Sequence, residues 1–215
     1  MTKIYLPLYL LLFIISQPSK SQITYHDITD SLGLYHTYPL GFYSGGVAFY
    51  DFDGDGWDDL SLASPGGDSL KFYKNMGGSF QQVSLLQTDP LEESKQILWA
   101  DYDNDGDKDL FVTHFLAENK LYQNDGNMNF TDVTAAAGLV TPDRATYGAC
   151  FGDYDKDGWL DLYVVNYSLG LSNPIPQRNF LFRNVGDGTF EETTLTAGVA
   201  AVSYTHLTLP TSVIV

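Results

Sequence analysis

Short apolar runs, each bounded by turn-forming residues, recur along most of this chain. They precede three Asp-rich segments at residues 47–50, 97–100 and 149–151, and they follow these segments at residues 60–63, 110–113 and 162–165. Runs this short, rich in β-branched and aromatic side chains and ending at Gly or Asp, are typical of strands rather than helices. The pattern therefore predicts a pair of short strands around each Asp-rich segment.

A second motif follows each strand pair, and it joins two aromatic-bearing runs through an Asn and a Gly-containing turn. The three copies run from residues 71–75 through Gly77-Gly78 to Phe80, from 120–124 through Asp125-Gly126 to Phe130, and from 180–184 through Gly186-Asp187-Gly188 to Phe190. An Asn followed by Gly-containing turn residues between two such runs signals a β-hairpin. Each unit thus holds about four short antiparallel strands, which is the content of one β-propeller blade.

The units repeat at offsets of 50 and 52 residues, because the Asp-rich segment 51–60 recurs at 101–110 and at 153–162. Residues 25–34 also share their spacing with residues 130–139 and 190–199. We therefore predict an all-β fold, a partial β-propeller of about three four-stranded blades plus an N-terminal closing strand. The predicted blades span residues 35–86, 87–140 and 141–201, and residues 22–34 are the closing strand of a preceding blade.

The two ends of the chain have other compositions. Residues 1–21 are typical of a secretory signal, with Lys3 before the apolar stretch 4–15 and small residues flanking Lys20. That stretch is shorter than the roughly 20 residues that span a bilayer. We expect cleavage near Ser21, a secreted or cell-surface protein, and no stable membrane insertion after cleavage. Residues 202–215 resemble the translation of a sequencing adapter, so we expect them not to be native and the chain to be a truncated fragment.

Charge and cysteine content restrict the function further. The net charge is −16, from 27 acidic and 11 basic residues, which argues against nucleic acid as a partner. The three Asp-rich segments hold five, five and four of the acidic residues, an arrangement expected of cation sites. The single cysteine, Cys150, excludes an intrachain disulfide framework, and its apolar neighbours predict a small buried side chain.

Each Asp-rich loop has aspartates at positions 1, 3, 5 and 9 and glycine at position 6. Alternate residues of such a tight loop point toward one cation, and the backbone carbonyl of position 7 completes an all-oxygen cage that favours calcium. An EF-hand is excluded because it needs Glu at position 12, where these loops have Leu62, Val112 and Val164. We therefore predict three calcium ions. Their predicted ligands are Asp51, Asp53, Asp55, Trp57 (backbone) and Asp59; Asp101, Asp103, Asp105, Asp107 (backbone) and Asp109; and Asp153, Asp155, Asp157, Trp159 (backbone) and Asp161.

These motifs together resemble a known family. The DxDxDGxxD loop, the Y-x-N-x-G-x-F hairpin and the F-x-D-V-T-x-x-A-G-L closing segment are similar to FG-GAP/VCBS repeats, in particular to the ASPIC/UnbV-associated, cartilage-acidic-protein-like group. The resemblance covers residues 25–199 and implies an integrin-α-like, usually seven-bladed propeller with calcium between the first two strands of a blade. This chain departs from the pattern in its three full repeats, its irregular first hairpin and an insertion at residues 167–179.

No catalytic set is evident, since His26, His36 and His114 are isolated and the loop carboxylates are assigned to metal. We therefore expect no enzyme activity, but a secreted calcium-binding module for extracellular binding or adhesion, with a protein or carbohydrate ligand. Two alternatives stay open: an accessory propeller of a secreted enzyme such as a polysaccharide lyase, and a structural spacer of a surface protein. Trp57 and Trp159 either stack on sugar rings or pack against the neighbouring blade.

Overall fold

The structure is a computed structural model, and it describes residues 24–34, 36, 38, 45–86, 92–167 and 177–200. The predicted signal segment 1–21 and the adapter-like tail 202–215 lie outside the described residues, so both stay predictions. Among the described residues, no helix has the length and apolar character to cross a membrane.

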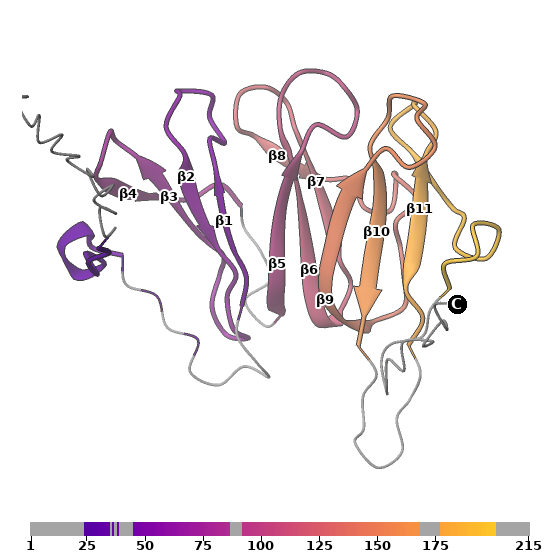
Figure 1. Ribbon diagram of the computed structural model, residues 1–215, viewed down its shortest axis with the longest axis horizontal. Helices are drawn as coiled ribbons and strands as arrows, with labels where there is room; N and C mark the ends of the chain where they lie inside the picture. Colours follow the sequence, from indigo (N-terminus) through magenta and orange to yellow (C-terminus); the bar gives the residue numbers. More distant parts are fainter. Residues whose placement is uncertain are drawn as a thin grey trace, which may run out of the picture.

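Twelve strands make up nearly all the regular structure of the described residues. The strands are β1 (Val47–Tyr50), β2 (Asp59–Leu62), β3 (Lys71–Asn75), β4 (Phe80–Val83), β5 (Glu93–Ala100), β6 (Asp109–Ala117), β7 (Lys120–Asn124), β8 (Phe130–Asp132), β9 (Arg144–Gly152), β10 (Asp161–Asn166), β11 (Phe180–Asn184) and β12 (Phe190–Glu192). They pair in sequence order as three antiparallel meanders, β1 to β4, β5 to β8 and β9 to β12. These meanders stand side by side as three blades in an open arc (Figure 1), so the predicted all-β, partial-propeller fold is confirmed.

The blades are joined differently at their two boundaries. Strand β6 runs past its own blade and pairs with β9, with Phe115 opposite Ala145, which merges the second and third blades into one sheet. A bulge at the exposed Leu116, whose φ is 59°, interrupts this pairing between Phe115 and Ala117. The first blade is tied to β5 by loop hydrogen bonds, among them Gly46 N donating to Lys95 O at 2.6 Å.

The apolar core lies between neighbouring blades rather than within one blade. Between the first and second blades, Trp99 of β5 stacks on Phe52 with ring centroids 5.4 Å apart, and Phe72 packs beside them. A second cluster between the other two blades includes Phe111 and Leu162, both buried. Since each blade buries its apolar face against a neighbour, apolar side chains on the first strand of the first blade, Val47 and Phe49, stay exposed, at 61% and 63%.

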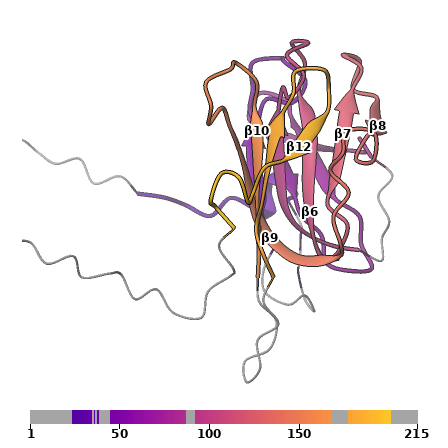
Figure 2. The same ribbon diagram turned by 90° about the vertical axis from the view of Figure 1, so that its right-hand side faces the viewer.

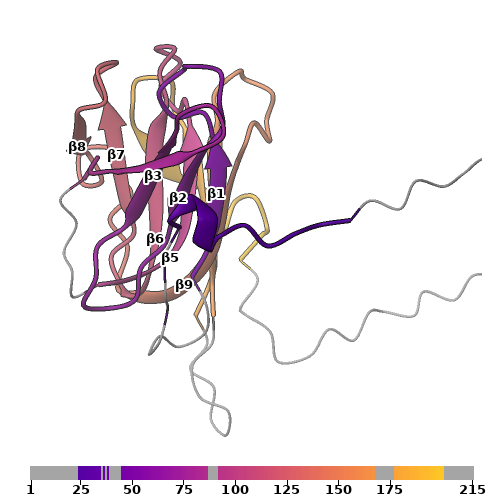
Figure 3. The same cartoon turned by 90° about the vertical axis from the view of Figure 1, so that its left-hand side faces the viewer.

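The N-terminal closing segment differs from its prediction. Residues 24–34 contain no strand, and their only regular element is the one-turn 3-10 helix η1 (Asp30–Leu32), which lies outside the first blade (Figures 1 and 3). A strand requires a partner for its backbone groups, and the described residues offer none to this segment. The turn within the segment does form.

The turn repeats the same three backbone hydrogen bonds in all three closing segments. At residues 28–34, Leu32 N donates to Ile28 O at 3.1 Å, and Gly33 N and Leu34 N complete the turn. The copies ending at Leu139 and Val199 have the equivalent bonds, and each contains a glycine in the left-handed region. The similarity of residues 25–34 to the other two segments is therefore conformational, although the strand is missing.

The prediction that Cys150 is buried was wrong. Its neighbour Ala149 faces the core between the second and third blades, so the alternation of a strand turns Cys150 to the opposite face of β9. That face of the last blade is uncovered in the described residues, and Cys150 is exposed. Figure 2 looks onto the third blade from this end of the arc.

Candidate metal centres in the three Asp-rich loops

The three Asp-rich loops connect the first two strands of each blade, and all lie along the upper edge of the arc in Figure 1. The register of each strand pair fixes its loop, because position 9 pairs with the residue that precedes position 1. Thus Tyr50 pairs with Asp59, Ala100 with Asp109, and Gly152 with Asp161. The three loops therefore leave their strands in the same way.

In each loop, three carboxylates converge. One oxygen from each of positions 1, 3 and 9 lies within 4.8 Å of the other two. The groups are Asp51, Asp53 and Asp59; Asp101, Asp103 and Asp109; and Asp153, Asp155 and Asp161. Three like charges this close repel one another unless a cation neutralises them, so the arrangement suits an oxygen-coordinated metal ion.

The position-9 aspartate is buried and ties each loop to its blade. Asp109, 1% exposed, accepts hydrogen bonds from Tyr102 N at 3.2 Å and from Asn124 N at 3.0 Å. Asp59 and Asp161 make the same two backbone contacts in their loops. Each carboxylate oxygen keeps a further lone pair, so this brace can also serve as a metal ligand.

Burial also affects the protonation of these aspartates. Desolvation raises the pKa of Asp109 to about 7, against the opposing effect of its two backbone hydrogen bonds. The same cause raises the pKa of Asp59 and Asp161. A cation beside each carboxylate would favour its ionised form, so metal binding and deprotonation are coupled in these loops.

The hairpin asparagine is a site residue that the sequence analysis missed. Asn75, Asn124 and Asn184 end the third strand of each blade, and each side-chain amide donates to the backbone carbonyl of loop position 8, at 3.0, 3.1 and 3.2 Å. The sequence analysis assigned this Asn to the turn alone. Its recurrence in all three repeats was the available signal, but the pairing with a loop at least 15 residues earlier depends on the sheet.

Glycine at position 6 makes the predicted sharp turn. Gly56, Gly106 and Gly158 have φ of 92°, 100° and 93°, in the left-handed region that favours glycine. The amide of each donates to the position-1 carboxylate, at 2.8 Å in the first loop, 3.2 Å in the second and 3.1 Å in the third. This contact places the position-1 side chain inside the loop.

The position-5 aspartates lie outside the three carboxylate groups. Asp55, Asp105 and Asp157 each accept a hydrogen bond from the position-7 amide, at 3.0, 3.1 and 3.0 Å. The structure thus brings together three of the four carboxylates predicted for each loop. Ligation by position 5, and by the backbone carbonyl of position 7, stays a prediction.

The position-7 tryptophans lie beside the hairpin turn of their own blade. Trp159 lies so close to the hairpin turn that a Cβ added at Gly186 would be 2.7 Å from its Nε1. Trp57 lies beside Gly77 more loosely and is 54% exposed. Stacking on a sugar ring and packing against the neighbouring blade both stay predictions for these two tryptophans.

The middle loop is the most exacting test of whether a cation fits. Among the described residues, the buried carboxylate oxygens without a hydrogen-bond partner are Asp101 Oδ1, Asp103 Oδ1 and Asp107 Oδ1. Desolvation is the main cause that raises the pKa of Asp103 and Asp107, and the negative charge of neighbouring carboxylates raises it further. Buried anionic oxygens without partners are costly, and a hard cation such as calcium would satisfy them.

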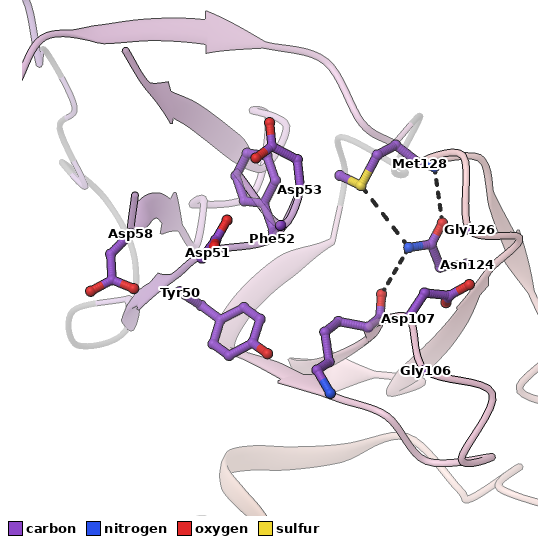
Figure 4. A pocket seen from close by; sticks show the side chains of 12 residues that line it. Tyr50, Asp51, Phe52, Asp53, Asp58, Gly106, Asp107, Asn124, Gly126 and Met128 are labelled. Atoms are coloured by element: carbon purple, nitrogen blue, oxygen red, sulfur yellow. Dashed lines mark hydrogen bonds between the residues drawn. The ribbon is translucent and has the colours of Figure 1, made fainter. Parts of the chain in front are cut away.

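A cleft of about 420 Å³ separates the first and middle loops (Figure 4). Asp51 and Asp53 lie on one wall, and Asp107 and Met128 lie on the other. The Asn124 amide holds the second wall together by contacting Met128 Sδ at 4.0 Å and Lys108 O at 3.1 Å. The loop face therefore offers an acidic recess between two candidate metal centres.

Two known proteins are similar to part of this chain. A curated relative, Cartilage acidic protein 1 of Xenopus tropicalis, is 24% identical over 167 residues, which cover 73% of this chain and 25% of the relative. This chain therefore spans about a quarter of that relative's length. A solved structure of an Agrocybe aegerita lectin, described as recognising non-reducing terminal N-acetylglucosamine, has a TM-score of 0.37 and 21% identity, over 67% of this chain and 37% of the lectin.

The family model described as an FG-GAP-like repeat matches twice, over residues 51–112 and 101–164. Each match begins at position 1 of one Asp-rich loop and ends in the second strand of the next blade. Together the two matches cover more than half of the chain and contain all three loops. The chain belongs to the family of FG-GAP-like repeat proteins.

Proposed function

We propose that this chain is a calcium-binding propeller module of an extracellular protein and presents a surface for binding or adhesion. The observation that carries the proposal is the convergence of the carboxylates at positions 1, 3 and 9 in three successive loops. One acidic turn would be an ordinary surface feature. Three turns with the same carboxylate geometry, each braced by a buried Asp and by the hairpin Asn, favour a common ligand.

Calcium suits this geometry better than magnesium or zinc. Calcium accepts irregular oxygen coordination, whereas magnesium requires near-ideal octahedral geometry and gives up its waters reluctantly. The loops contain no His or Cys, the side chains that zinc prefers. If they resemble other extracellular modules, calcium binds at about 10⁻⁴–10⁻³ M.

The proposed extracellular location and partner rest on separate features. The predicted signal segment at residues 1–21 supports export. The acidic cleft between the first and middle loops supports a protein or carbohydrate ligand that is recognised beside bound calcium. Loop faces held by a rigid sheet commonly carry binding functions.

Thermal unfolding of the purified chain tests the calcium proposal. Because metal binds the folded loops preferentially, one site at 100 times its dissociation constant adds roughly 2.7 kcal/mol to the free energy of unfolding. We expect a chelator to lower Tm and millimolar calcium to restore it, while equal magnesium restores it less. An unchanged Tm in chelator, or equal effects of the two cations, would contradict the proposal.

A further inference from the structure

The three loops differ at one position of the strand that packs behind them. The residue before the hairpin Asn is Lys74 on β3, Gln123 on β7 and Arg183 on β11. All three side chains extend to the loop of their own blade. The first and third loops therefore face a cation of the protein itself, and the middle loop faces a neutral amide.

Lys74 and Arg183 each bridge two aspartates. The Lys74 ammonium contacts Asp53 Oδ2 and lies 3.0 Å from Asp55 Oδ2. In the third loop, Arg183 Nε lies 2.7 Å from Asp155 Oδ2, and Nη2 lies 3.2 Å from Asp157 Oδ2. Each cation thus pairs with the carboxylates of positions 3 and 5, two of the predicted metal ligands.

The middle loop has no equivalent bridge. Gln123 Nε2 donates to Asp103 Oδ2 at 2.7 Å, and within the described residues no Lys or Arg nitrogen lies within 4.0 Å of Asp103 or Asp105. The nearest cation, Lys108, is 3.7 Å from Asp101 Oδ2. Asp107 adds a carboxylate with a buried, unpartnered oxygen at the position where the other two loops have tryptophan.

We infer that the residue before the hairpin Asn sets the cation affinity of each loop, and that the middle loop is the tightest site. The inference rests on the proposed calcium function. An incoming ion competes with Lys74 or Arg183 for the position-3 carboxylate, whereas in the middle loop it meets carboxylate oxygens that have no partner. Calcium affinity rises with the number of free ligand charges.

Partly exposed ion pairs of this kind are weak individually, so the difference in affinity is limited. Two such contacts correspond to about a tenfold change in the dissociation constant. The outer loops are therefore expected to fill at about ten times the calcium concentration that fills the middle loop. The chain would then respond to calcium in two stages rather than one.

The position-6 glycine amides are a separate probe for each loop. Each of Gly56, Gly106 and Gly158 donates to the position-1 carboxylate, so its NMR resonance shifts when a cation binds there. We expect Gly106 to reach its midpoint first in a calcium titration of the full chain. Gln123→Lys should move that midpoint about tenfold higher, to the range of the other two, and Lys74→Gln should lower the midpoint of Gly56 alone.

Lys71→Gln is the matched control, because Lys71 lies on the same strand as Lys74 but pairs with Asp68, at 2.6 Å, away from the Asp-rich loop. It should leave all three midpoints unchanged. Midpoints that coincide in the parent, or a Gly106 midpoint unaffected by Gln123→Lys, would overturn this inference and leave the calcium proposal intact. Glycine resonances that do not move at 10 mM calcium would overturn both.

Discussion

Asn184→Ala tests whether the hairpin asparagine braces the loops. The Asn184 side chain is fully buried, and its amide donates to Leu160 O at 3.2 Å in its own loop and to Tyr102 O at 2.7 Å in the middle loop. Its Oδ1 accepts a hydrogen bond from Gly186 N at 3.0 Å. The alanine variant would leave two carbonyls and one amide of the backbone without these partners.

The size of the effect follows from these three contacts. A buried polar group left without its partner costs about 1–3 kcal/mol, so the variant should lose roughly 3–5 kcal/mol after partial relaxation. That is a large part of a typical total stability of about 5–15 kcal/mol. Asn184→Asp keeps the acceptor but loses both donated bonds, so it should not rescue stability.

Urea unfolding at saturating calcium measures this loss while the proposed sites stay occupied. Asn127→Ala is the control, since Asn127 is exposed and its side chain contacts only Asp125 O, at 3.3 Å. The control should lie within about 0.5 kcal/mol of the parent. If Asn184→Ala were equally mild, the hairpin asparagine would not be a brace.

Three further predictions concern other parts of the blades. Burial lowers the pKa of His114 to about 4. The free energy of unfolding should therefore fall by up to about 3 kcal/mol as pH drops from 6.5 toward 4, because the unfolded chain takes up a proton that the folded chain does not. Urea unfolding of His114→Gln should show a smaller fall of the midpoint over this pH range. The Lys95 ammonium is buried against Glu93 and lies over the Tyr147 ring, 5.2 Å from its centroid. Glu93→Gln removes the opposite charge from this buried ammonium, so it should lower Tm more than Lys95→Met, which removes the ammonium itself. The reverse order would contradict this account. Cys150 should react with a thiol reagent in the folded chain as fast as in urea, and protection in the native state would refute its exposure.

The strands and loops could be predicted from the sequence because their signals are local and repeat three times. Alternation, turn glycines and the Asp spacing all lie within about ten residues, and position 6 has the conformation that its glycine predicted. The closing strand could not be predicted reliably, because strand formation at residues 22–34 depends on a partner elsewhere. Whether Cys150 is buried or exposed depends on which face of β9 a neighbouring blade covers, and the local sequence does not contain that information.

In the candidate site, too, the features with a local sequence signal could be predicted and the contacts between distant residues could not. Loop spacing predicted that the carboxylates at positions 1, 3, 5 and 9 converge, since a tight loop points alternate residues inward, and those at positions 1, 3 and 9 do converge. It did not predict that position 5 lies apart, or that Lys74 and Arg183 reach these loops. Those contacts join residues about 20 to 30 positions apart, and the register of the first three strands of each blade determines them.

The most direct test of the account is the number of calcium ions bound per chain. Equilibrium dialysis at saturating calcium, with excess magnesium to suppress diffuse binding to the acidic surface, should give three ions for the parent and two for Asp103→Ala. The loops at Asp51 and Asp153 should keep their ions, because the converging carboxylates of each group all come from one loop. No bound calcium in the parent, or three ions in Asp103→Ala, would contradict the claim that the three loops are independent calcium sites.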